Sequence, residues 1–188
     1  MLAPLGFWEP QLWHPYVGAW VYRAVRTLAP DTDIMSGVAW TPIFLLPLVV
    51  AAFLLACHAM GCSPLSSFTA GVFFVLSQIY LKRSTYAWYD NDTYTVLFPL
   101  LGLAFFFLAL KNTSEKRRLL LFSVLSALTA ALYSRFWPGW GYLWALTVFS
   151  GVLIAGKAWL LKEQRLPRLW MLLGLLVAVP VLAVTMMI

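Results

Sequence analysis

The chain has 188 residues, of which 62% are hydrophobic and 11% charged, and its formal net charge is +6. Soluble domains average roughly 45–50% apolar and about 25% charged residues, so this composition excludes an ordinary soluble protein and predicts an integral membrane protein. The positive charge does not indicate nucleic-acid binding, because several of the 13 Lys and Arg residues flank apolar runs, as membrane topology requires.

Residues 1–36 contain no run that is long enough to span a membrane. Within this segment Arg23 and Arg26 lie on one face of a helical pattern. Apolar residues recur at helical spacing on another face, at Val17, Trp20, Val21, Ala24, Val25 and Leu28. The pattern predicts an amphipathic helix that lies at the membrane surface and ends at Pro30 and Asp31.

Six apolar runs of near-spanning length follow the amphipathic segment. They cover about residues 37–60, 65–81, 93–110, 119–134, 142–161 and 169–188. Crossing a bilayer core about 30 Å thick takes about 20 apolar residues, so the second and fourth runs are short and should require tilting or local thinning. We therefore predict an all-α membrane protein: a polytopic bundle of about six transmembrane helices over residues 37–188, preceded by an interfacial helix in residues 1–36.

The links between the runs predict the topology. Lys111, Lys116, Arg117 and Arg118 lie in one link, and two runs later another link holds Lys162, Arg165 and Arg168. Loops rich in Lys and Arg are expected in the cytoplasm. The link at residues 82–93 and the turn at residues 137–142 then face outward together.

The two cysteines, Cys57 and Cys62, fall at the end of one run and in the next link. The predicted topology places both at the cytoplasmic end of the bundle. Disulfides are rare in that reducing compartment, so both are expected to be free thiols.

The link at residues 82–93 holds two of the chain's seven carboxylates, Asp90 and Asp92. On a regular helix these positions point about 200° apart, whereas an extended or loop conformation places both on one side. Carboxylate oxygens suit Mg²⁺ or Mn²⁺, which often bridge to a phosphorylated substrate. The alternative is a pair of solvated carboxylates. Arg83 is either an interfacial anchor or a bidentate phosphate ligand.

The turn from Trp137 to Tyr142 reads Trp-Pro-Gly-Trp-Gly-Tyr and follows Arg135. Aromatic faces beside an arginine suit a sugar or a lipid headgroup. The simpler interpretation is a glycine-bearing link with aromatic residues at the membrane interface. The sequence contains no Ser/His/Asp triad, zinc-ligand spacing or glycine-rich phosphate loop.

Residues 83–92, Arg-Ser-Thr-Tyr-Ala-Trp-Tyr-Asp-Asn-Asp, resemble the second short acidic motif of oligosaccharyltransferase catalytic subunits, which are C-type glycosyltransferases. Ala87 stands where the family pattern has glycine. The arginine-to-aspartate interval matches the bacterial single-subunit enzymes, and the resemblance is to the bacterial or archaeal single-subunit type. Residues 20–30 and 136–142 are similar to the helix closing the family's first external loop and to its aromatic turn. The resemblance covers nearly all 188 residues in order.

The resemblance implies transfer of an oligosaccharide from a polyprenyl-diphosphate carrier to the asparagine of an Asn-x-Ser/Thr sequon. It implies that Asp90 and Asp92 are catalytic and form the site for Mn²⁺ or Mg²⁺: Asp90 resembles the carboxylate that holds the metal, and Asp92 resembles its partner, which helps to bind the metal or engages the acceptor amide. Arg83, Trp137 and Tyr142 would bind the donor. The implied partners are this lipid-linked oligosaccharide, an acceptor polypeptide and membrane lipid. The implied location is a bacterial or archaeal cell membrane, with the active-site loops on the external, periplasmic face.

Several parts of the family pattern are absent from the 188 residues. These are the first acidic motif, an acidic residue from a later external loop, and a soluble C-terminal domain with a Trp-Trp-Asp-Tyr-Gly-like motif. We therefore expect an N-terminal membrane-domain fragment, truncated at both ends relative to the family and inactive alone, in which residues 1–36 are part of the first external loop. The alternatives are another C-type glycosyltransferase that uses a polyprenyl-phosphate sugar, and a non-catalytic membrane subunit or transporter fragment. The lack of a polar stripe inside the runs disfavours a transporter.

Overall fold

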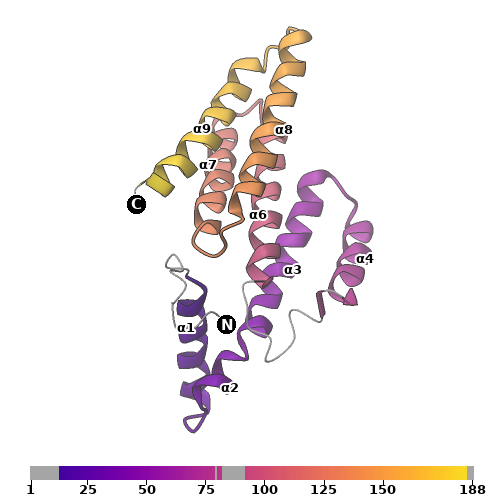
Figure 1. The fold of residues 1–188 in the computed structure, drawn as a ribbon. Coiled ribbons are helices and arrows are strands. Elements are labelled where there is room, and N and C mark those ends of the chain that lie inside the picture. The colour runs from indigo at the N-terminus through magenta and orange to yellow at the C-terminus, as the bar shows by residue number, and fades with distance from the viewer. Residues whose placement is uncertain (1–12, 79, 82–91, 186–188) are drawn as a thin grey trace.

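The computed structural model describes residues 13–78, 80–81 and 92–185, and within these ranges every regular element is an α-helix, as predicted (Figure 1). The helices are α1 (His14–Leu28), α2 (Ile34–Val38), α3 (Thr41–Met60), α4 (Pro64–Val75), α6 (Asp92–Lys111), α7 (Lys116–Tyr133), α8 (Trp140–Leu160) and α9 (Leu166–Thr185).

Three stretches of the described chain are long and apolar enough to cross a membrane: Ile34–Met60, Asp92–Lys111 and Trp140–Leu160. They correspond to the predicted runs 37–60, 93–110 and 142–161. Pro64–Val75 and Leu166–Leu182 are shorter apolar helical stretches. Helix α7 begins with three basic residues, which lower its hydropathy. These helices indicate an integral membrane protein that crosses the bilayer more than once, whereas the number of six crossings stays a prediction.

The predicted run 65–81 is not one continuous helix. Helix α4 ends at Val75, and the chain leaves the helical conformation at Leu76 and Ser77. The Ser77 hydroxyl accepts a hydrogen bond from the Tyr80 N–H at 3.3 Å, and the Ser77 carbonyl accepts one from the Leu81 N–H at 2.9 Å. Ser77 therefore caps the start of a new helical turn, which an apolar-run count does not detect.

Helix α1 forms where the amphipathic helix was predicted and ends at Leu28, just before Pro30, whereas its position at the membrane surface stays a prediction. It packs against α2 through a close contact at Gly37, where an added Cβ would lie 2.5 Å from Cδ2 of Tyr22. Asp33 caps α2 by accepting a hydrogen bond from the Ser36 N–H at 3.0 Å. Hydrogen bonds from the Ser36 hydroxyl and amide hold the pKa of Asp33 below its usual value.

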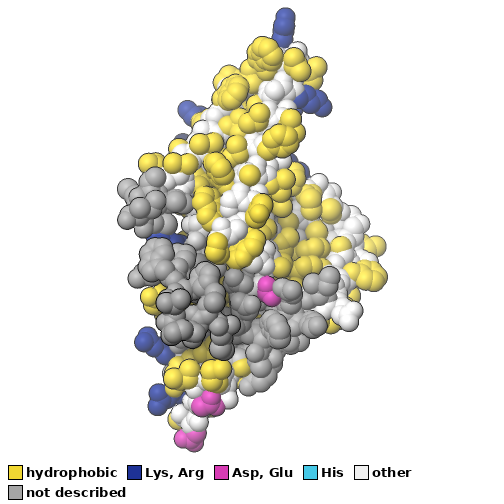
Figure 2. Space-filling model, in the orientation of Figure 1, with side chains coloured by type: hydrophobic (Ala, Val, Ile, Leu, Met, Phe, Trp, Pro, Cys, Tyr) yellow, Lys and Arg dark blue, Asp and Glu magenta, His cyan; other side chains and the backbone are white. Residues whose placement is uncertain are grey.

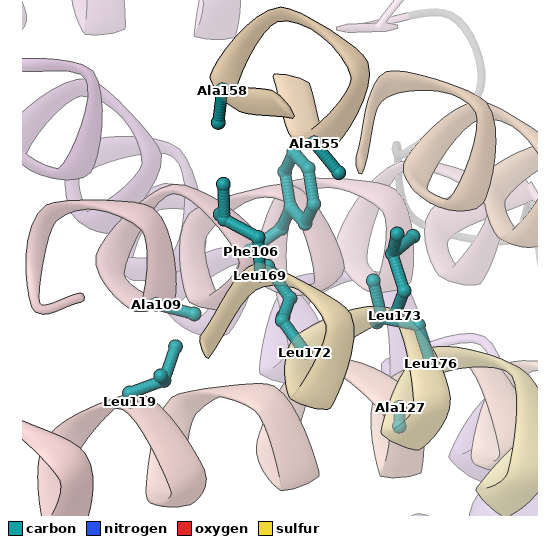
Figure 3. Close-up of a cluster of buried hydrophobic side chains, with 10 residues drawn as sticks. All are labelled: Phe106, Ala109, Leu119, Ala127, Ala155, Ala158, Leu169, Leu172, Leu173 and Leu176. Carbon is teal, nitrogen blue, oxygen red and sulfur yellow. The ribbon is translucent and has the colours of Figure 1, made fainter. Parts of the chain in front are cut away.

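Helices α6, α7, α8 and α9 share one buried core (Figure 3). Alanines at the facing positions let the helices approach closely. Two hydrogen bonds between helices add to this packing: Ser126 Oγ donates to the Gly102 carbonyl at 3.0 Å, and Trp144 Nε1 donates to the Leu176 carbonyl at 2.9 Å. The core side chains are Phe106, Ala109, Leu119, Ala127, Ala155, Ala158, Leu169, Leu172, Leu173 and Leu176.

Two glycines of α8 make a matched test of this core. A Cβ on Gly151 would lie 2.7 Å from Cδ2 of Leu173, whereas a Cβ on Gly156 would have nothing within 4 Å. We expect Gly151→Ala to destabilise the bundle by about 1–3 kcal/mol through overpacking. Gly156→Ala should instead stabilise it by about 0.5–1 kcal/mol through helix propensity. The midpoint of thermal unfolding in detergent micelles measures both; equal midpoints would contradict the described packing of α8 on α9.

The loops of the described residues group at two ends of the bundle. At one end Lys111 Nζ donates to the His58 carbonyl at 3.2 Å, and Arg168 donates to the Thr113 carbonyl. These contacts gather the α6–α7 loop, the α8–α9 turn and the end of α3. On the face that Figure 2 shows, Lys and Arg side chains lie at the α8–α9 end and also in the opposite half, where the visible Asp and Glu side chains lie. Asp92, at the start of α6, is at the opposite end from Lys111.

Candidate functional site

Of the predicted acidic site, the structure describes Asp92. This residue is the first of α6 and is half-buried. A helix N-terminus favours a negative charge because the main-chain N–H groups point toward it. Arg83 and Asp90 lie outside the described residues, so their predicted pairing with Asp92 stays a prediction. Among the described residues no group of three or more His, Cys, Asp and Glu side chains is placed to hold a metal ion.

The aromatic turn follows directly from the end of α7. The Phe136 and Trp137 N–H groups donate to the Tyr133 carbonyl at 2.9 and 3.0 Å, and the Trp140 N–H donates to the Trp137 carbonyl at 3.3 Å. The Trp137 ring stacks on Tyr133 with centroids 5.7 Å apart. The ring also covers Gly139, where an added Cβ would lie 2.2 Å from its Cη2 and Cζ3 atoms. Glycine is required at position 139 because the indole occupies that space.

Trp137 and Tyr142 line one groove of about 250 Å³, which we call the aromatic groove. Their ring centroids are 6.4 Å apart. The structure therefore brings together both aromatic residues that the sequence predicted for substrate binding. The aromatic groove is lined by Thr95, Pro99, Leu103, Tyr133, Trp137, Gly139, Tyr142, Leu143 and Leu146.

The α6 side of the aromatic groove supplies a polar group. Pro99 has no N–H to donate to the Thr95 carbonyl, so that carbonyl lacks its usual helical partner. Thr95 lies one turn beyond Asp92, and its hydroxyl donates to the Asp92 carbonyl at 2.7 Å. The groove thus combines aromatic walls with a polar residue, Thr95, on its α6 side.

A buried aromatic stack lies next to the aromatic groove and shares Tyr133 with it. The Tyr94 and Phe136 rings have centroids 4.6 Å apart, and Phe98 lies 5.4 Å from Tyr133 and 4.9 Å from Phe136. Both tyrosines are only 2% exposed. Burying four rings between α6 and α7 holds the start of α6 against the aromatic turn. Sequence reasoning missed this stack, although the spacing of Tyr94 and Phe98 by four residues is a signal for a shared helix face.

Helix α1 reaches the same end of the bundle. The Trp13 N–H donates to the Arg135 carbonyl at 2.7 Å, the Arg135 guanidinium lies 5.7 Å from the Trp13 ring centroid, and Trp13 meets Phe136 edge to face at 6.3 Å. Arg135 is therefore engaged by a cation–π contact. A second, apolar groove of about 520 Å³ lies between α1 and the bundle, lined by Trp13, Tyr16, Val17, Trp20, Phe98, Leu132 and Phe136.

Comparison with known protein families gives one match: a family model described as oligosaccharyl transferase STT3, N-terminal, matches residues 3–188. The matched range includes the acidic link, the aromatic turn and all the described helices. No curated protein and no solved structure gives a significant match.

Proposed function

Because the chain belongs to the oligosaccharyl transferase STT3 family, we propose that it forms the N-terminal membrane part of a catalytic subunit that moves a glycan from a polyprenyl-diphosphate carrier to the asparagine of an Asn-x-Ser/Thr sequon. The observation that carries the proposal is the family match over residues 3–188, in which the acidic link and the aromatic turn occur in the expected order. The proposed enzyme is of the bacterial or archaeal single-subunit type.

The proposed division of the chain follows the same family pattern. Residues 1–36 would be part of the first external loop, and residues 37–188 the transmembrane domain. The carboxylate pair and the aromatic turn would face the external side of the membrane. We further propose that these 188 residues do not transfer glycan alone.

We propose that Asp90 and Asp92 hold Mn²⁺ or Mg²⁺. The position of Asp92 as the first residue of α6 fits this role, because its carboxylate supplies the oxygen ligands that hard cations prefer. The ion would supply Lewis-acid stabilisation of the negative charge on the diphosphate leaving group. Arg83 would add a bidentate contact to a phosphate.

The aromatic groove is proposed to position the donor. Trp137 and Tyr142 offer flat apolar faces for the sugar ring or the first isoprenoid units. We propose that the Thr95 carbonyl, which lacks a helical N–H partner at Pro99, accepts a hydrogen bond from a donor hydroxyl. Holding the donor in this way fixes the anomeric carbon for attack in line with the departing diphosphate.

The acceptor amide needs activation because its nitrogen lone pair is delocalised, with a rotational barrier of about 18–20 kcal/mol in peptide amides. Asp92 is proposed to accept hydrogen bonds from the amide N–H groups and to favour rotation out of conjugation. In the transfer step the amide nitrogen bonds to the anomeric carbon, the carbon–oxygen bond to the diphosphate breaks, and the amide proton passes to a carboxylate. The net result is one N-glycosidic bond and a free polyprenyl diphosphate.

A donor comparison tests the proposed function. Enzyme that contains this chain is reconstituted in liposomes with a fluorescent Asn-x-Thr peptide, and with either a polyprenyl-diphosphate oligosaccharide or a polyprenyl-monophosphate sugar. We expect glycopeptide with the diphosphate donor and none with a Gln-x-Thr peptide. Transfer from the monophosphate donor alone would instead assign the chain to another class of C-type glycosyltransferase. Absence of transfer with both donors, from enzyme verified as folded, would favour a non-catalytic subunit.

A further inference from the structure

Helix α3 ends in a turn that brings two cysteines together. Gly61 adopts φ of 88°, the Gly61 N–H donates to the His58 carbonyl at 3.0 Å, and the Cys62 N–H donates to the Cys57 carbonyl at 3.0 Å. These are the two hydrogen bonds of a Schellman motif, in which the side chains of the first and last residues commonly meet. Here those two residues are Cys57 and Cys62.

The two thiols differ in exposure. Both are free. Cys57 lies in the last turn of α3 and is 5% exposed, whereas Cys62 is exposed to solvent. The hydrogen bond between their main chains brings the α-carbons together, as a disulfide requires, since bridged α-carbons lie roughly 4.4–6.8 Å apart.

We propose that Cys57 and Cys62 form a redox-sensitive pair that closes to an intramolecular disulfide by exchange with a small disulfide such as oxidised glutathione. The exposed Cys62 thiolate attacks one sulfur of oxidised glutathione, which forms a mixed disulfide and releases one glutathione thiolate. Cys57 then loses its proton to solvent and attacks the Cys62 sulfur. The protein disulfide forms, the mixed disulfide breaks, and a second glutathione leaves.

The order of these two steps follows from burial. A bulky disulfide reaches the exposed Cys62 but not the buried Cys57 inside α3. Cys57 therefore attacks only after Cys62 is modified. The Schellman turn already holds the two residues close together for this step. The thiols stay reduced in a reducing compartment and close when the ratio of disulfide to thiol rises, so the proposal agrees with the free thiols predicted from the sequence.

A Cys57–Cys62 disulfide would cross-link the α3–α4 turn where the end of α6 contacts it. Lys111 of α6 donates to the His58 carbonyl, within this same turn. A Cβ on Gly61 would lie 3.6 Å from Lys111 Nζ. The disulfide would therefore restrain the turn against which the end of α6 packs.

The test uses the purified 188-residue chain in detergent micelles, first reduced and then incubated with oxidised glutathione. No Lys or Arg occurs between Arg26 and Lys82, so trypsin leaves both cysteines in one peptide, residues 27–82. We expect that peptide to lose the mass of two hydrogens, to stop reacting with maleimide, and to recover both properties in dithiothreitol.

Single variants separate closure from simple modification. Cys57→Ala should trap glutathione on Cys62, and Cys62→Ala should leave Cys57 unmodified until the chain is denatured. In the wild-type chain a lasting glutathione adduct on Cys62, or dimers linked through Cys62 with Cys57 still free, would overturn the proposal. A Cys57 thiol that reacts in folded Cys62→Ala as fast as Cys62 does in Cys57→Ala would overturn the proposed order of the steps.

Discussion

Replacing Asp90 or Asp92 by asparagine in an enzyme that contains this chain should lower the rate of glycan transfer by about 10²–10³-fold, the cost of removing one preorganised electrostatic contact to a transition state. Asparagine keeps the shape of the side chain and removes the charge that a divalent cation and the acceptor amide require. The initial rate of glycopeptide formation, measured at saturating donor and at a Mn²⁺ concentration that just saturates the wild type, gives the effect. Raising the Mn²⁺ concentration should partly rescue a variant whose defect is metal affinity.

Asp31 offers the matched control for this experiment. It is an exposed carboxylate just beyond α1, so Asp31→Asn removes the same charge without touching the proposed site. We expect the Asp31→Asn rate to equal that of the wild type. Wild-type rates in both Asp90→Asn and Asp92→Asn would contradict the assignment of these residues to catalysis.

Gly139→Ala should raise KM for the lipid-linked donor by roughly tenfold, the equivalent of about 1.4 kcal/mol. The new methyl group would meet the Trp137 indole at 2.2 Å, so the ring must leave its place over the turn. Forced repacking of this kind costs about 1–3 kcal/mol. Since Trp137 forms one wall of the aromatic groove, displacement of its ring changes the groove. Donor titrations at fixed acceptor concentration measure KM and kcat separately.

Gly141 is the control in the same turn. A Cβ there would have nothing within 4 Å, and the residue lies in the first turn of α8, so alanine should leave KM unchanged. Trp137→Ala, which removes the wall altogether, should raise KM at least as much as Gly139→Ala. If Gly139→Ala and Gly141→Ala have the same KM as the wild type, the aromatic groove does not bind the donor.

The long apolar helices were predictable because composition alone decides them. The runs 37–60, 93–110 and 142–161 correspond to helical stretches that the structure shows with bounds shifted by a few residues. Breaks inside a run are harder to predict, since one hydrogen bond decides them. At Ser77 a single side-chain cap starts a new turn in an otherwise apolar stretch.

The candidate site was predictable where its residues are neighbours in sequence. Trp137 and Tyr142 belong to one short turn, so their meeting follows from local structure. The opposite wall, with Thr95 and Pro99, depends on how α6 packs against α7 and α8, and no local pattern specifies that packing. The pairing of Asp90 with Asp92 stays a prediction, because Asp90 lies outside the described residues.

For the two cysteines, one property was predicted from the sequence and another was missed. Their free state was predicted from the expected compartment, and both are free thiols in the structure, whereas the compartment itself stays a prediction. The main-chain hydrogen bond that joins them was missed, although Gly61 just before Cys62 is the usual sequence signal of a Schellman turn. Combining that signal with the five-residue spacing would have predicted the pair.

The proposal that Asp90 and Asp92 hold a divalent cation is tested most directly by measuring how much Mn²⁺ the enzyme binds during a Mn²⁺ titration followed by electron paramagnetic resonance. The account predicts saturable binding to wild type and to Asp31→Asn, and a large loss of affinity in both Asp90→Asn and Asp92→Asn. Unchanged Mn²⁺ affinity in those two variants would show that the acidic link does not hold the ion.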